Sequence, residues 1–240
     1  RWLPRIAHDP AYNRNLTLAS ASHAFEIELA TGITWDPDWR PRPRVLGHPA
    51  DRMGCGEYRI IAPMRCLANQ GLIQSYESNY YLTTPGLARM SPDVVIVQRQ
   101  VEWGHVACLQ EYARHNQSFR IYELDDLLTN VQLQNCARKK IQSADLIKRF
   151  RKALNLCDRM VVSTDYLADE YRRYIDDVVV VPNYVERARW GGLRPLRRQS
   201  ERPRVGWAGS MHHTGDFASM VDVVKATRAE VDWIFFGMWP

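Results

Sequence analysis

Residues 93–99 have the sequence DVVIVQR, an apolar run bounded by charged and polar side chains. A short unbroken run of this kind is typical of a parallel strand that is covered on both faces. Similar segments recur along the chain, at residues 44–49, 119–126, 159–165 and 177–185, and a further strand is expected near 74–82. Strands that alternate with helical patterns predict an α/β fold with a doubly wound, Rossmann-like parallel sheet.

Helical periodicity separates these strands. The first expected helix follows the turn MGCGEYR (53–59) and ends near Gly71, and the second ends near His115. The third runs from about Val131 to Cys157, and the fourth begins at a cap formed by Thr164 or Asp165.

The pattern restarts at residues 204–216, RVGWAGSMHHTGD, with a strand, a polar turn and a helix from about Asp216 to Ala229, followed by the apolar segment VDWIFFGM. A single β-α-β unit cannot cover both faces of its own sheet. We therefore expect residues 204–240 to begin a second Rossmann-like domain that is truncated here. The other expected parts are an N-terminal arm (1–41), the first Rossmann-like domain (42–185) and an arginine-rich linker (186–203).

Composition indicates a globular protein, because 45% of the 240 residues are hydrophobic. The sequence has no run of about 18 apolar residues and no features of a secretory signal at its start, so we expect a cytoplasmic protein. The five cysteines form no C-x-x-C pair, which argues against a zinc or redox site. The net charge is +5, and seven arginines fall between Glu186 and Arg204. Without a nucleic-acid motif, this basic segment is interpreted as a connector that could contact anionic lipid at a membrane surface, and no nucleic-acid partner is expected.

Two glycine-bearing turns follow predicted strands. Ligands of open α/β sheets bind where strands end and helices begin, because backbone N–H groups there favour phosphate. Gly54 and Gly56 form the first turn, and Gly209 with Ser210 the second. Both could also be ordinary tight turns. Arg59, in the first turn of a helix, could face an anionic ligand or lie on the surface.

A dinucleotide site is a minor alternative for the first turn. Gly54-Cys55-Gly56 begins a G-x-G-x-x-G pattern, and Glu77 follows about twenty residues later. Arg59 stands where the third glycine is expected, however, and would crowd the packing of helix on strand.

Two further polar groups are candidates for a site. Asp125 and Asp126 end the segment YELDD and could orient sugar hydroxyls, bind a divalent cation or cap the following helix. His212, His213 and Asp216 have metal-ligand atoms but lack the dense spacing of a metalloenzyme helix. For these residues we expect hydrogen bonding to a ligand or to the turn instead.

The order of these segments resembles a GT-B glycosyltransferase of the glycosyltransferase 1/4-like type. The resemblance covers roughly residues 42–240 and rests on the glycine turn GCGEYR, DVVIVQR, YELDD, CDRMVVSTDYLADEY, VVVVPNYV and RVGWAGSMHHTGD. It implies two facing Rossmann-like domains, with the acceptor bound mainly by the first and a nucleotide-sugar donor mainly by the second. It also implies that no metal is required and that the nucleotide sugar is a substrate rather than a cofactor.

Carried over to this sequence, the resemblance implies that Gly54 and Gly56 face the donor phosphates and the transferred sugar. Asn183 matches the asparagine of a hinge segment, and Gly209 with Ser210 match the first turn of the donor domain. His212 and Arg59 join these residues as expected donor or phosphate contacts, with Asp125 and Asp126 as the catalytic candidates.

The expected activity is transfer of a sugar from a nucleoside-diphosphate sugar to a glycan, lipid-linked or protein acceptor. The family's later donor-domain elements have no counterpart before Pro240, so the 240-residue chain alone is expected to be inactive. The alternatives are a non-catalytic nucleotide-sugar-binding or scaffold module of a larger protein, and a sugar-nucleotide epimerase on the same fold.

Overall fold

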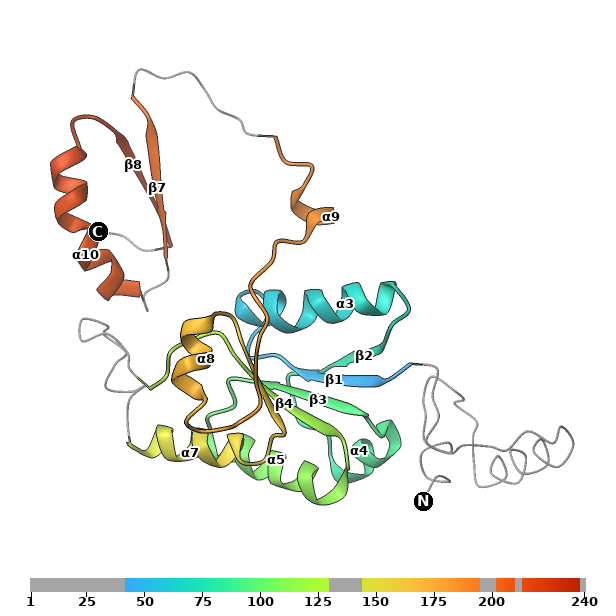
Figure 1. The fold of residues 1–240 in the computed structure, drawn as a ribbon. Helices are drawn as coiled ribbons and strands as arrows, with labels where there is room; N and C mark the ends of the chain where they lie inside the picture. The colour runs from blue at the N-terminus through green and yellow to red at the C-terminus, as the bar shows by residue number, and fades with distance from the viewer. Residues whose placement is uncertain (1–41, 130–143, 195–201, 210–212, 238–240) are drawn as a thin grey trace, which may run out of the picture. The chain divides into compact units, whose positions relative to one another are not determined.

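The computed structural model describes residues 42–129, 144–194, 202–209 and 213–237 (Figure 1). Among these, the chain divides into two compact units. The first unit holds residues 42–126 and 149–185, and the second holds the remaining described residues. The predicted N-terminal arm, residues 131–143 of the long predicted helix, and the site candidates Ser210 and His212 lie outside the described residues.

The first unit is built on one parallel sheet of six strands, in the order β2-β1-β3-β4-β5-β6. The strands are β1 (Arg44–His48), β2 (Gln74–Glu77), β3 (Val94–Gln98), β4 (Phe119–Leu124), β5 (Arg159–Val162) and β6 (Val178–Val180). All neighbouring strands pair in parallel. The prediction of an α/β fold with a Rossmann-like parallel sheet is therefore confirmed.

Helices flank this sheet on both faces. They are the π-helix η1 (Glu57–Ile61), which continues into α3 (Ala62–Asn69), and α4 (Thr84–Met90), α5 (Trp103–His115), α7 (Ala144–Leu154), which belongs to the first unit from Arg149 on, and α8 (Asp165–Tyr171). Figure 1 shows α3 on one side of the sheet and α4, α5 and α7 on the other. This arrangement covers both faces of the central strands, as their unbroken apolar runs require.

Close packing at Gly47 positions the first helix. A Cβ atom on this glycine would lie 2.7 Å from Ile60 Cγ2 and 2.7 Å from Met64 Sδ, so the helix lies directly against β1. Both side chains are buried, together with Val45. The backbone that follows the glycine turn is thereby fixed against the sheet.

Helix α4 and strand β2 differ from the sequence prediction. Helix α4 was not expected; it begins at a Thr83 cap, whose side chain accepts a hydrogen bond from Gly86 N, and has a proline in its first turn. Strand β2 is shorter than predicted, because the chain turns after Glu77 and Ser78 Oγ hydrogen-bonds within that turn, to the backbone of Tyr80.

The second unit contains the predicted β-α-β pattern: β7 (Arg204–Ala208), α10 (Thr214–Thr227) and β8 (Asp232–Phe236), with the two strands parallel. A short helix, α9 (Arg187–Trp190), lies within the predicted linker. From residue 202 onward, no described apolar side chain is fully buried. None of the helices within the described ranges is long and apolar enough to span a bilayer.

Candidate functional site

The carboxyl end of the sheet carries the candidate site. The helices that follow β1 and β3 lie on opposite faces of the sheet (Figure 1), and β1 pairs with β3. Such a switch in direction leaves a crevice at the carboxyl ends of the two strands, which is where open α/β sheets bind ligands. The segments that end here are residues 49–56 after β1, Arg99 after β3, Asp125 and Asp126 after β4, and 181–183 after β6.

Asp51 organises the turn after β1. Its Oδ1 atom accepts hydrogen bonds from the backbone N–H groups of Met53 (3.0 Å), Gly54 (2.5 Å) and Gly56 (3.3 Å). Its Oδ2 atom accepts one from the Cys55 thiol at 3.1 Å. Burial alone would raise the pKa of Asp51, but these hydrogen bonds outweigh it and lower the pKa. The turn is therefore closed around an ionised carboxylate.

Gly56 is required by close packing. A Cβ atom there would lie 1.8 Å from the backbone oxygen of Asp51, a distance that no other residue can tolerate. At Gly54 the nearest atom to such a Cβ is the Asp51 carboxylate, at 3.2 Å. The N–H groups of both glycines point to Asp51, and their predicted contact with donor phosphates stays a prediction.

The Cys55 thiol is not a reactive group. Burial, together with the hydrogen bond to Asp51, raises its pKa to about 12, so the thiol stays protonated at neutral pH.

Arg99 brings together the two predicted catalytic candidates. Its Nη2 atom lies 3.2 Å from Asp125 Oδ1, 2.7 Å from Asp126 Oδ2 and 3.2 Å from the sulfur of Cys55. Arg99 has a left-handed backbone (φ +50), which is rare for a residue with a side chain. The side chains of Arg99, Asp125 and Asp126 are 33%, 16% and 55% exposed. This cluster offers accessible acceptors and donors side by side, a combination suited to hydroxyl groups.

A second charged group lies deeper at the same edge. Arg59 Nε lies 2.6 Å from Glu123 Oε1, and the two side chains are only 4% and 3% exposed. Arg59 Nη1 also donates to the backbone oxygen of Val181 (2.6 Å) and to Asn183 Oδ1 (3.0 Å). Burial raises the pKa of Glu123 to about 7, against the opposing effect of Arg59.

These contacts correct one alternative from the sequence. Arg59 is not a surface arginine; its guanidinium is held between the ends of β4 and β6, and its predicted contact with an anionic ligand is untested. Asn183, predicted as a hinge residue, is one of its partners. Neither Glu123 nor Arg99 was singled out from the sequence, although each is a charged side chain at the end of an apolar strand.

Buried His48, at the end of β1, has a structural role. Its Nδ1 donates to the Ser78 backbone oxygen (2.8 Å), its Nε2 lies 3.3 Å from the Tyr112 hydroxyl, and its ring stacks on Tyr81. Burial lowers the pKa of His48 to about 4, so the imidazole is neutral at pH 7. It fastens the loop after β2 to the sheet.

The second unit shows the turn after β7 in part. Gly209 N donates to the Phe236 backbone oxygen (3.1 Å), and a Cβ atom on this glycine would lie 3.2 Å from Trp207 Nε1. His213 Nδ1 lies 2.8 Å from Asp216 Oδ2, a pair within the start of α10. Within the part of the chain that the structure describes, no three His, Cys, Asp or Glu side chains form a metal-ligand group.

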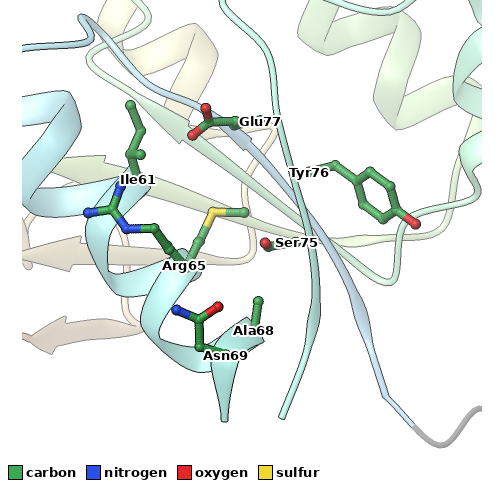
Figure 2. Close-up of a pocket in the computed structure, with 8 residues that line it drawn as sticks. Ile61, Arg65, Ala68, Asn69, Ser75, Tyr76 and Glu77 are labelled. Atoms are coloured by element: carbon green, nitrogen blue, oxygen red, sulfur yellow. The ribbon is translucent and has the colours of Figure 1, made fainter. Parts of the chain in front are cut away.

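A pocket of about 270 Å³ lies between α3 and the edge strand β2. Figure 2 shows Arg65 and Asn69 projecting from the helix, with Ser75 and Glu77 across from them on the strand. Arg52 Nη1 lies 3.0 Å from Glu77 Oε1 and joins this pocket to the turn after β1. The pocket is thus separate from the Arg99 cluster but linked to the same turn.

No protein-family model matches this sequence, and a search of curated proteins likewise finds no match.

Proposed function

We propose that this chain is part of a GT-B glycosyltransferase, which moves a sugar from a nucleoside-diphosphate sugar to a hydroxyl group of a glycan, lipid-linked or protein acceptor. The observation that carries the proposal is the Arg99–Asp125–Asp126 cluster at the carboxyl end of the parallel sheet. A second β-α-β unit that opens with a glycine turn adds support, since a GT-B enzyme needs two Rossmann-like domains.

The cluster suits a polyhydroxylated ligand better than a phosphate. A sugar hydroxyl both donates and accepts hydrogen bonds. Asp126, the more exposed carboxylate, would accept from the hydroxyl, and Arg99 would donate to it. Two carboxylates beside one guanidinium leave a net negative charge, which disfavours a second anion at the same place.

In this proposal the first unit binds the acceptor and the second binds the donor. Asp126 would hold the attacking hydroxyl and accept its proton, while Arg99 and Asp125 fix the position of Asp126. Holding the hydroxyl in a fixed place lowers the entropic part of the barrier. Helix N-termini and cationic side chains of the donor domain would stabilise the departing diphosphate.

One observation favours a second candidate, a nicotinamide-dinucleotide enzyme. Glu77 ends β2, where the acidic residue that binds ribose stands in that class of fold. Against it, Glu77 pairs with Arg52, and the N–H groups of Gly54 and Gly56 are already bonded to Asp51.

Substitution of Asp126 tests the main proposal. In the longest soluble product of this gene, Asp126→Asn should lower sugar transfer at least about tenfold, because the amide cannot accept the proton. Asp169→Asn is the matched control: Asp169 is an exposed aspartate on α8, paired with Arg172, and its loss should leave transfer unchanged. Transfer by Asp126→Asn at the rate of the control would refute the assigned role. Tight binding of NAD(H) without sugar transfer would instead support the second candidate.

A further inference from the structure

A single side chain joins two segments of the first unit that are far apart in sequence. Arg59 lies 122 residues before Val181, yet its guanidinium bonds to the backbone oxygen of Val181 and to Asn183 Oδ1. The remaining contact is the buried ion pair with Glu123. The arginine therefore bridges the helix after β1, the end of β4 and the segment after β6.

The helix that carries Arg59 has an unusual geometry. Arg59 is the third residue of η1, a π-helix that begins directly after Gly56. A π-turn is rare and is frequently found at functional sites. Ile60 and Ile61, the next two residues, are buried, so the backbone beneath the guanidinium is held by the core.

The segment that Arg59 holds is the one by which the chain last leaves the first unit, ahead of α9 and β7. Directly after β6, the N–H group of Val181 donates a hydrogen bond to the Val162 backbone oxygen of β5 at 2.8 Å. Pro182 has no N–H group to donate. Two residues later Tyr184 and Val185 are 76% and 70% exposed, and the first unit ends at Val185.

We propose that Arg59 is a positioning residue, which fixes the direction in which the chain leaves the first unit and so limits where the second unit can stand. The planar guanidinium suits this task, because its donors point to three fixed acceptors at once. Glu123 holds the guanidinium in place, while Val181 and Asn183 are the groups that it positions. The proposal concerns the path of the chain and does not depend on sugar transfer.

Asn183→Ala is the decisive variant, since it removes one acceptor and leaves the Arg59–Glu123 pair intact. Asn116→Ala is the matched control: Asn116 Oδ1 accepts a hydrogen bond from Ser118 N at 2.7 Å in a loop far from the exit segment. Two dyes are attached through non-natural amino acids at Arg173 in the first unit and Lys225 in the second, both exposed positions. Single-molecule energy transfer between the dyes in the whole chain reports the distance between the two units.

We expect Asn183→Ala to shift and broaden the distribution of transfer efficiencies, with a larger effect for Arg59→Lys. Asn116→Ala should lower the melting temperature by a similar amount as Asn183→Ala without changing the distribution. A distribution for Asn183→Ala that matches the wild type would overturn the proposal, and Arg59 would then be a structural residue only. Should Arg59→Lys fail to fold, the Asn183 variant alone decides the question.

Discussion

At the scale of single residues, Glu123 and His48 are buried groups whose pKa values move in opposite directions. Burial raises the pKa of Glu123 from 4.5 to about 7, so the folded chain binds the proton of this carboxyl more tightly than the unfolded chain does. Its contribution to stability is therefore present below pH 4.5 and is lost as the pH rises through 7. Burial lowers the pKa of His48 from 6.5 to about 4. The contribution of His48 to stability is therefore present above pH 6.5 and is lost as the pH falls through 4.

The two groups change the free energy of unfolding in opposite directions over nearly the same pH range. Each change amounts to up to about 3 kcal/mol. We expect the stability lost on Glu123→Gln, measured by urea unfolding, to decrease as the pH rises from about 4.5 to 7, because the ionised carboxylate is costly to bury. The stability lost on His48→Asn should increase from about pH 4 to 6.5. If the Glu123→Gln difference grew with pH instead, the ion pair with Arg59 would outweigh burial.

Gly56 gives a second test at this scale. Gly56→Ala should destabilise the protein by more than about 3 kcal/mol, because the new methyl group overlaps the backbone of Asp51. Gly104→Ala is the control: no atom lies within 4 Å of a Cβ there, and alanine in helix α5 should be neutral or stabilising by up to about 1 kcal/mol. Thermal unfolding measures both variants, and equal melting temperatures would contradict the described turn.

The sequence identifies some site residues but not their partners. Gly54, Gly56 and the Asp125–Asp126 pair stand out because each follows a recognisable strand. Arg99 is 26 residues from Asp125, and Glu123 is 64 from Arg59. Their pairing depends on the order of strands in the sheet, which local patterns do not encode.

At the scale of elements, the two units differ in how much they bury. The strands β3 and β4 lie in the middle of a six-stranded sheet with fully buried side chains, whereas β7 and β8 pair only with each other among the described residues. Backbone amides of β3 and β4 should therefore exchange with solvent far more slowly than those of β7 and β8, because they open only when the sheet unfolds. Hydrogen exchange read by mass spectrometry checks this expectation. Comparable protection in both sets would show that the second unit has a core of its own.

The sequence predicts strands and helices correctly where the apolar runs are long. The predictions are wrong where local hydrogen bonds determine where a helix begins or a strand ends. The strands at 44–49, 93–99 and 159–165 and the helix ending near His115 are confirmed. Helix α4 is short and depends on its Thr83 cap, and β2 ends early at the Ser78 turn. The π-helix η1 is not predicted from the sequence, and neither is the close packing of Ile60 and Met64 against Gly47, which depends on how the helix and β1 meet in the fold.

At the scale of the whole molecule, a series of alternating strands and helices, an arginine-rich connector and one further β-α-β unit predict a first sheet and the start of a second domain. The described residues contain a six-stranded sheet and a two-stranded sheet, and the truncated second domain stays a prediction. In the proposed enzyme, the Arg99 cluster would bind the acceptor hydroxyl and Arg59 would direct the chain toward the donor domain. Neither role follows from the fold alone, because the same parallel sheet serves many unrelated functions.

The most direct test of the proposed sugar transfer is release of nucleoside diphosphate from UDP-, GDP-, ADP- and TDP-sugars by the longest soluble product of this gene, with and without hydroxyl acceptors. We expect release from one of these donors, accelerated by an acceptor. No release from any donor, together with no change in melting temperature on adding any of them, would contradict it.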